Sequence, residues 1–268
     1  MKGRVLVVAG SDSGGGAGIQ ADIKTVMALG GYAMTAITAL TAQDTRGVHA
    51  VHAVPADFVA HQMRLALADI GADCIKTGML HRADIVEAVA DVIDKYAGGI
   101  PLVVDPVMVA KGGEALLLDD AAQALARRLI PRATVLTPNL PEAGALAGMP
   151  VVDLGTMKLA TAKLAEMGCE SVLLKGGHLE GPTLFDLFAD MTGTEVFETQ
   201  RIETVHTHGT GCTLASAIAT GLAQGLALRH AVERARAYLI EAIRTAPNLG
   251  RGHGPLNHAY VIRSREGD

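Results

Sequence analysis

Short, wholly apolar runs alternate along most of this chain with longer segments whose apolar residues recur every three or four positions. The runs Val5–Ala9 and Leu102–Val104 carry apolar side chains at successive positions, so both faces of each strand would be buried. A strand with two buried faces needs helices on both sides of its sheet. The alternation of runs and helical segments therefore predicts an α/β fold in which a mostly parallel sheet lies between helix layers.

The same periodicity gives the boundaries of the expected elements. Strands are predicted at Arg4–Ala9, Ala33–Leu40, Ala50–Val54, Cys74–Gly78, Leu102–Asp105, Thr134–Thr137, Ser171–Lys175, Leu184–Ala189, Glu195–Glu198 and Arg201–Val205. Helices are predicted at Ile19–Leu29, Ala56–Asp69, Ala83–Lys95, Asp119–Leu129, Leu140–Ala147, Met157–Met167, Cys212–Gln224 and Leu228–Thr245. The stretch 184–205 has strands without helices between them, which predicts a small antiparallel addition at one edge. No linker or repeat divides the sequence, so residues 1–268 are expected to form one domain.

Composition narrows the class of protein. Hydrophobic residues make up 49% and charged residues 19% of the chain, which is typical of a globular fold. A net charge of −5 and only 3% aromatic residues argue against a nucleic-acid partner. The cysteines are widely spaced and odd in number, which favours a reducing cytoplasm over a disulfide framework. No stretch approaches the roughly 20 apolar residues of a membrane span, so we expect a soluble cytoplasmic protein without a membrane partner.

A glycine-rich loop follows the first predicted strand and leads into a helix. This loop, 10–18, has the strand–loop–helix context of a phosphate-binding site. It departs from the dinucleotide fingerprint because Ile19 stands where the third glycine is required, and the chain has no Gly-Lys-Ser/Thr of a Walker motif. Two interpretations stay open, a phosphate-binding loop and a tight connection between strand and helix.

A second small-residue loop, Gly209-Thr210-Gly211, precedes Cys212 at the start of another predicted helix. Free N–H groups and the helix dipole make such a start a binding site for anions. The dipole also predicts a lowered pKa for the Cys212 thiol. Cys212 is then a covalent nucleophile, a general base beside the anion site, or a small buried filler. The nearby His206 and His208 have no further metal ligand beside them. They are therefore interpreted as polar residues that lead into the loop and not as a metal site.

Polar residues also follow other predicted strands, where ligands bind in parallel α/β folds. Asp105 ends an apolar run and would hold Mg²⁺ through water or cap a turn. Asn139 and Glu142 have the spacing of a helix capping box, and the glutamate would still point towards the ligand edge. Lys175 precedes two glycines, which suits a nucleotide phosphate and also a solvated surface lysine.

Taken together, a set of motifs spread in order over nearly the whole chain resembles the hydroxymethylpyrimidine/phosphomethylpyrimidine kinases of thiamin biosynthesis, which are ribokinase-like. The motifs are GSDSGGGAGIQAD (10–22), TAQDT (41–45), IKTGML (75–80), VVDPVMVAKGG (103–113), LTPNLPEA (136–143), LLKGGH (173–178), HGTGCTLASAIA (208–219) and GHGPLNH (252–258). One departure is Gly14, where the family often has a second serine. The resemblance implies a ribokinase-like three-layer sandwich without a separate large lid domain, and a homodimer. It implies two successive transfers that depend on ATP and Mg²⁺, first to 4-amino-5-hydroxymethyl-2-methylpyrimidine and then to its monophosphate.

The resemblance also implies roles for particular residues. Asp22 and Gln43 would hydrogen-bond the aminopyrimidine, and Gly10, Met79 and Val107 would line its pocket. For phosphoryl transfer it implies an anion site formed by Gly209, Thr210 and Gly211, with Cys212 as the base. Asp105, Asn139 and Glu142 would arrange Mg²⁺, and Lys175 would contact the ATP phosphates. The resemblance also implies a mobile loop at Lys111-Gly112-Gly113 that can close over the site.

Rival functions remain at this point. Vitamin B6 (pyridoxal) kinases share the fold and sometimes the cysteine, although Gln43 and Met79 favour the pyrimidine by resemblance. A pyrimidine-sensing domain without catalysis would be expected to have lost groups such as Cys212, Asp105 and Lys175, which are all present. A nicotinamide-dependent oxidoreductase is disfavoured by the failed dinucleotide fingerprint.

Overall fold

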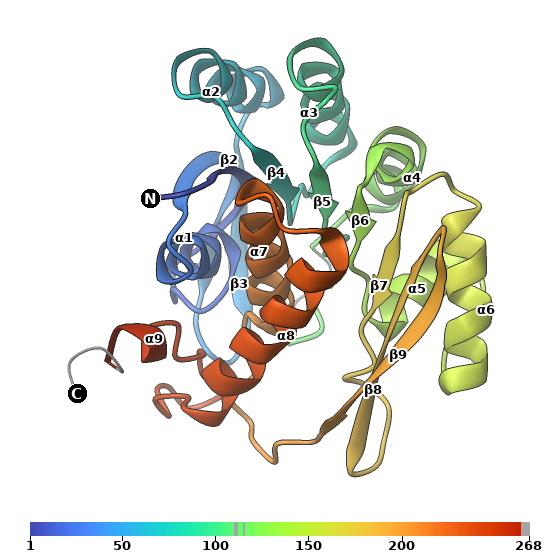
Figure 1. The fold of residues 1–268 in the computed structure, drawn as a ribbon. Helices are drawn as coiled ribbons and strands as arrows, with labels where there is room; N and C mark the ends of the chain where they lie inside the picture. The colour runs from blue at the N-terminus through green and yellow to red at the C-terminus, as the bar shows by residue number, and fades with distance from the viewer. Residues whose placement is uncertain (110–111, 115, 264–268) are drawn as a thin grey trace.

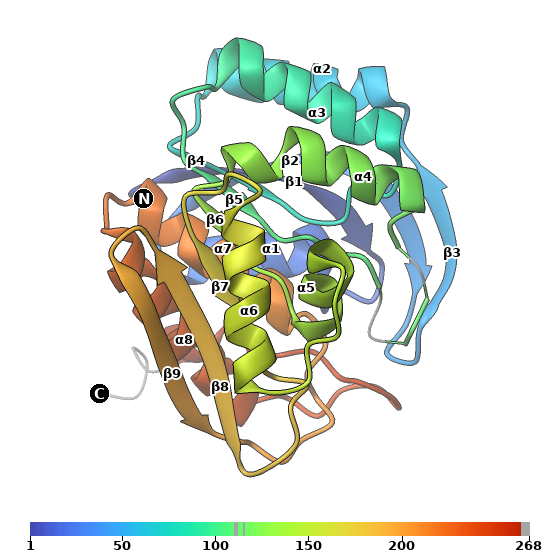
Figure 2. The same ribbon diagram turned by 90° about the vertical axis from the view of Figure 1, so that its right-hand side faces the viewer.

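A mixed sheet with helices on both faces forms the core of the computed structural model, which describes residues 1–109, 112–114 and 116–263 (Figures 1 and 2). Within these residues the sheet has the strand order β3-β2-β1-β4-β5-β6-β7-β8-β9. The strands are β1 (Arg4–Asp12), β2 (Tyr32–Gln43), β3 (Val48–Ala53), β4 (Cys74–Thr77), β5 (Leu102–Val104), β6 (Val135–Leu136), β7 (Val172–Leu174), β8 (Thr183–Asp190) and β9 (Gly193–Gln200). The strands from β2 to β7 are parallel, whereas β3, β8 and β9 pair antiparallel with their neighbours.

The helices divide between the two faces of the sheet. One face carries α1 (Gly18–Ala28), α7 (Thr210–Ala223) and α8 (Leu228–Arg244), with the short α9 (Tyr260–Arg263) beside them. The other carries α2 (Ala56–Asp69), α3 (Ala83–Tyr96), α4 (Asp119–Arg128), α5 (Leu140–Ala147) and α6 (Leu154–Ala165), with the 3-10 turn η1 (Ile130–Arg132).

The central strand β1 shows why the sheet is covered on both sides. Leu6 and Val8 belong to the core under α2 and α3, while Val5, Val7 and Ala9 belong to the core under α1 and α7. These five side chains are at most 1% exposed. Side chains alternate between the faces of a strand, so an unbroken apolar run requires two cores. The predicted sheet between helix layers is therefore confirmed.

Most predicted elements are confirmed with shifts of a few residues, but one strand is wrong. The predicted strand Arg201–Val205 is irregular backbone in the structure. Its start is tied down elsewhere, because the Arg201 N–H bonds the Pro182 carbonyl and its guanidinium bonds carbonyls in the segment 177–181. The segment then leads to the start of α7 instead of pairing in the sheet. The antiparallel addition is confirmed as β8 and β9, and a second antiparallel strand, β3, closes the opposite edge.

The carboxyl ends of the parallel strands bring the polar residues of interest to one edge of the sheet. Asp105 follows β5, Asn139 follows β6 and Lys175 follows β7, and a bridge pairs Asn139 with Lys175. The amino end of α7 is directed to the same edge. Among the described residues no helix combines the length and apolar character needed to cross a membrane, and no separate lid domain stands apart from the sheet (Figure 1).

Candidate active site

The carboxylate of Asp105, the ammonium of Lys175 and the first turn of α7 meet at this edge. Lys175 Nζ lies 3.0 Å from Asp105 Oδ1, and Thr137 Oγ1 donates to the same oxygen at 3.1 Å. A Cβ placed on Gly211 would lie 3.2 Å from Lys175 Nζ and 3.6 Å from Asp105 Oδ2. Asp105 is 2% exposed, so the ion pair is partly desolvated and strong. A cation and a helix N-terminus that share one small space form a site for an anion.

Gly209 shapes the start of α7 because it occupies the N-cap position with φ of +83°. The left-handed region favours glycine, and the surroundings leave no room for a side chain. A Cβ at Gly209 would lie 1.9 Å from the carbonyl oxygen of Gly16. The two glycine loops therefore interlock, and this contact fixes the direction in which the first N–H groups of α7 point.

Asp12 explains the first glycine loop, and its role was not predicted. Its carboxylate accepts the N–H groups of Gly14, Gly16 and Ala17 at 2.8–3.0 Å. It also pairs with His208 Nε2 at 2.8 Å, and its pKa lies below the usual range. Burial opposes this lowering, but the hydrogen bonds and the His208 contact outweigh it. Because these N–H groups are hydrogen-bonded to Asp12, they are not available to a phosphate. This favours the interpretation of the loop as a tight strand-to-helix connection.

Asn139 and Glu142 form the predicted capping box at the start of α5. Asn139 Oδ1 accepts from the Glu142 N–H at 2.9 Å, and Glu142 Oε2 accepts from the Asn139 N–H at 2.8 Å. Burial raises the pKa of Glu142 to about 7, the positive charge of Lys175 opposes the rise, and the negative charge of Asp105 adds to it. A carboxylate whose negative charge is disfavoured by burial and by a neighbouring carboxylate is a suitable ligand for a divalent cation.

The donor set at this corner fits Mg²⁺, which prefers oxygen ligands and keeps several waters. Asp105, Asn139 and Glu142 all offer oxygens, although capping and pairing within the protein use part of their capacity. In the described residues no group of three or more His, Cys, Asp and Glu side chains is assembled as a direct metal site. The arrangement is thus consistent with a cation held mainly through water.

Cys212 lies in the first turn of α7, as predicted, but the expectation of a lowered thiol pKa is wrong. Burial raises the pKa of the Cys212 thiol to about 12. The Lys76 ammonium and the Gly18 N–H act against the rise, while the carboxylates of Asp22 and Asp105 add to it. Cys212 is only partly buried, but the atoms packed around the sulfur displace enough water to outweigh the favourable helix position. The thiol is therefore protonated in the free protein, and a base role would require it to lose its proton once the substrates are bound.

Asp22 makes contacts that the sequence did not predict. Its oxygens lie 2.9 and 3.0 Å from Lys76 Nζ, and Ser216 Oγ donates to Oδ1 at 2.7 Å. Asp22 and Lys76 are both 0% exposed. The carboxylate has no free surface, so the hydrogen bond to an aminopyrimidine, implied by resemblance, would require Lys76 or Ser216 to release it. That hydrogen bond stays a prediction.

The other residues implied to contact a pyrimidine gather near the ends of β1, β2 and β4. A Cβ at Gly10 would lie 3.0 Å from Met79 Sδ, so these two residues face one another. Val107 packs in the same small apolar cluster as Met79. The Gln43 side chain accepts from Thr41 Oγ1 at 3.0 Å, and its Nε2 lies 3.5 Å from His208 Nε2. Lys111 lies outside the described residues.

His258 supports α7 from the C-terminal segment. Its Nε2 lies 3.0 Å from Thr213 Oγ1, the residue after Cys212, and it is 6% exposed. Burial lowers the pKa of His258 to about 4 from an ordinary value of 6.5, and the charge of Lys24 adds to the lowering. The histidine is therefore neutral in the folded protein at neutral pH.

This shift predicts a loss of stability in acid. The unfolded chain binds a proton at His258 near pH 6.5, whereas the folded protein resists it until about pH 4. The contribution of neutral His258 to the free energy of unfolding is full above pH 6.5. It decreases as the pH falls, by ~2 kcal/mol near pH 5. Urea unfolding at neutral pH and near pH 5 measures it, and His258→Gln should lessen the difference between them. An unchanged difference in that variant would contradict the assignment.

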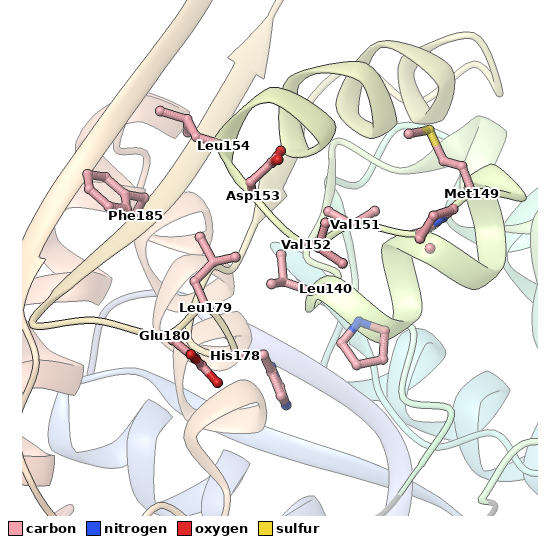
Figure 3. Close-up of a pocket in the computed structure, with 13 residues that line it drawn as sticks. Leu140, Met149, Val151, Val152, Asp153, Leu154, His178, Leu179, Glu180 and Phe185 are labelled. Carbon is pink, nitrogen blue, oxygen red and sulfur yellow. The ribbon is translucent and has the colours of Figure 1, made fainter.

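A pocket of about 780 Å³ lies beside this site, not in it. It opens between α5, the α5–α6 connection and the segment that leads into β8. Figure 3 shows Leu179 and Phe185 on one side and Leu140 and Val151 opposite, so its lining is largely apolar. None of the residues implied by the sequence lines it. The convergence of charged groups, not cavity size, identifies the site.

Three comparisons place the chain among known proteins. A family model described as phosphomethylpyrimidine kinase matches residues 12–257. A thiamine biosynthesis bifunctional protein of Geobacter sulfurreducens is 52% identical over 98% of this chain, which spans only 54% of that relative. A hydroxymethylpyrimidine/phosphomethylpyrimidine kinase of Streptomyces coelicolor is 47% identical over 96% of this chain and 95% of its own length. The solved structure of an ADP complex of Bacillus subtilis pyridoxal kinase has a TM-score of 0.91 and 38% identity, covering 98% of this chain and 99% of that one.

Proposed function

Because the chain belongs to the phosphomethylpyrimidine kinase family, we propose that it phosphorylates 4-amino-5-hydroxymethyl-2-methylpyrimidine and then its monophosphate, in thiamin biosynthesis. It is a kinase with a ribokinase-like fold. The observation that carries the proposal is the meeting of Lys175, Asp105 and the first turn of α7. ATP is the phosphoryl donor in this proposal, in keeping with the nucleotide in the related pyridoxal kinase structure.

Charge stabilisation is the main task of the protein in phosphoryl transfer. The N–H groups from Gly209 to Gly211 would hold the oxygens of the transferring group, and the Lys175 ammonium would contact ATP phosphates. Asp105, Asn139 and Glu142 would hold Mg²⁺, which supplies positive charge to the nucleotide phosphates when bound. Gln43, Gly10, Met79 and Val107 would orient the pyrimidine so that its hydroxymethyl group faces the start of α7.

Cys212→Ala should impair the first transfer far more than the second. The first nucleophile is a hydroxyl group that must lose a proton, and loss of a general base lowers such rates by roughly 10²–10⁴-fold. The second nucleophile is an ionised phosphate oxygen that needs no base. We expect at least a ~100-fold loss in the first step and a change within about threefold in the second. Separate initial rates with each substrate measure this, and equal losses in a folded variant would rule out the base role.

The function is tested by incubating the protein with ATP and Mg²⁺ and, separately, the pyrimidine, its monophosphate or pyridoxal. Mass spectrometry of the products should show the monophosphate and then the diphosphate. Phosphorylation of pyridoxal alone would support the second candidate, a vitamin B6 kinase, which the close match to a pyridoxal kinase structure favours. Binding of the pyrimidine without any product would leave a sensing domain.

The family resemblance further supports one domain over 1–268, a homodimer and a cytoplasmic location. The dimer is measurable as a doubled mass in light scattering after size-exclusion chromatography. A single monomer mass over the working concentration range would contradict it.

A further inference from the structure

A buried ionic network lies under the start of α7 and links distant parts of the chain. Lys76 comes from β4, Asp22 from α1 and Ser216 from α7. Lys76 Nζ is within 2.9–3.0 Å of both Asp22 oxygens, and Ser216 Oγ donates to Asp22 at 2.7 Å. All three residues are 0% exposed. Lys76 lies in the motif 75–80, in which the resemblance gives a role to Met79 but none to Lys76.

The network lies next to Cys212. Ser216 follows Cys212 by one turn of α7, so the two side chains share a face of the helix. The residue after the strand end of β4, Gly78, leaves space for the ammonium, because a Cβ there would lie 3.0 Å from Lys76 Nζ. The Lys76 ammonium acts to lower the pKa of the Cys212 thiol, and a Cys212 thiolate acts to raise the pKa of Lys76. The network thus extends from β4 to the reactive end of α7.

Charged groups from every element at this position act on the Cys212 thiol. Lys76 on β4 favours the thiolate, whereas Asp22 on α1 and Asp105 after β5 disfavour it. Lys175 after β7 interacts with Cys212 as well, and the Gly18 N–H at the start of α1 favours the thiolate. Lys76, wholly buried and paired with Asp22, is thus a cation whose charge favours the thiolate.

The contribution of the buried Lys76–Asp22 ion pair to folding stability does not by itself explain why the pair is present. Desolvation of two charges can exceed their mutual attraction, and apolar replacements of buried ion pairs are often neutral or stabilising. A wholly buried lysine is rare unless it is paired. Its position beside a group that the first transfer needs therefore points to a role in the site.

We propose that Lys76 is a positioning residue for the first transfer: its ammonium, held by the Asp22 carboxylate to which Ser216 donates, supplies a fixed positive charge beside Cys212 and the first turn of α7. Lys76 touches no substrate and acts through Cys212. The proposal rests on the proposed kinase function for its catalytic consequence. The charge assignment itself is measurable without turnover.

The test compares two variants that change the charge in opposite directions. Iodoacetamide reacts with thiolate, so its rate at Cys212, followed by mass spectrometry at one neutral pH, reports local charge. Lys76→Met should slow alkylation roughly tenfold, and Asp22→Asn should speed it roughly tenfold, since an opposite charge nearby shifts a pKa by one unit or more. A purely structural role would expose the sulfur in both variants and speed both reactions. Changes in the same direction would overturn the proposal.

Two further variants keep the proposal testable if Lys76→Met does not fold. Lys76→Met leaves Asp22 buried without its partner, which is strongly destabilising. The double variant Lys76→Met/Asp22→Asn removes both charges and keeps an acceptor for Ser216. Alkylation in the double variant should fall between the rates of the two single variants, and a rate outside that range would count against the proposal. Ser216→Ala, which retains both charges, should change the alkylation rate less than either single charge variant does.

The kinase assay separates this proposal from the proposed function. Lys76→Met should lower the first transfer and largely spare the second, as for Cys212→Ala. If the wild-type protein transfers no phosphate while the two alkylation rates diverge as expected, the proposed function fails and the charge assignment stands. If the wild type is active and alkylation is unchanged in both variants, Lys76 is not the positioning residue.

Discussion

Gly209→Ala is expected to lower both phosphoryl transfers by at least ~100-fold, because a misplacement of about 1 Å in a site can reduce rates by that factor. Gly209 has φ of +83°, and a Cβ would lie 1.9 Å from the Gly16 carbonyl oxygen. A Cβ and a carbonyl oxygen cannot lie that close, so the start of α7 must move away from the first glycine loop. Gly211 would then leave its place beside Lys175 and Asp105. Initial rates with each pyrimidine substrate measure the loss.

Gly225→Ala is the matched control. Gly225 lies just after α7 with φ of +84°, and a Cβ there would meet nothing within 4 Å. Both variants therefore carry the strain of a left-handed alanine, roughly 1 kcal/mol, but only one creates a collision. Gly225→Ala should retain near wild-type rates with a slightly lower melting temperature. Similar rates in the two variants would mean that the interlock of the glycine loops does not position α7.

The fold was predictable because its information is local. A run such as Val5–Ala9 reveals two buried faces without any knowledge of what covers them. The predicted bounds of α2 and α5 agree with the structure, since capping and periodicity act within a few residues. The segment Arg201–Val205 failed for the opposite reason. Its alternation is typical of a strand, but hydrogen bonds to a distant loop, 177–182, decide its path.

The site was predictable only in part, because its electrostatics depend on contacts between distant residues. Strand-end residues such as Asp105 and Lys175 follow from the topology of parallel sheets. The Lys76–Asp22 pair joins residues 54 positions apart, and Asp12 meets His208 across 196 positions. No local pattern announces such pairs. The raised pKa of Cys212 has the same origin, since burial by other elements outweighs the local effect of its helix.

Lys175→Met should reduce both transfers by ~10²–10³-fold, the usual consequence of removing one donor that stabilises transition-state charge. Methionine keeps much of the length and loses the ammonium. Both steps transfer the same group from ATP, so both should suffer, in contrast to Cys212→Ala. Rates with each substrate at saturating and limiting ATP give the change in kcat and in KM for ATP.

Lys175→Met is also expected to destabilise the folded protein, so the loss of activity must be separated from a loss of stability. Lys175 Nζ lies 3.0 Å from Asp105 Oδ1, and Asp105 is 2% exposed, so Lys175→Met leaves a buried carboxylate without its counter-charge. Such a loss costs roughly 3–5 kcal/mol. The double variant Lys175→Met/Asp105→Asn removes that burden, because an amide keeps an acceptor for Thr137 without a charge. Asp105→Asn alone is measured beside it, because Asp105 is itself a proposed Mg²⁺ residue. Recovery of the melting temperature in the double variant, with both transfers still well below those of Asp105→Asn alone, would separate catalysis from folding. Recovery of both would mean that Lys175 serves only to neutralise Asp105, since a group that contacts phosphates cannot be replaced by removing its partner.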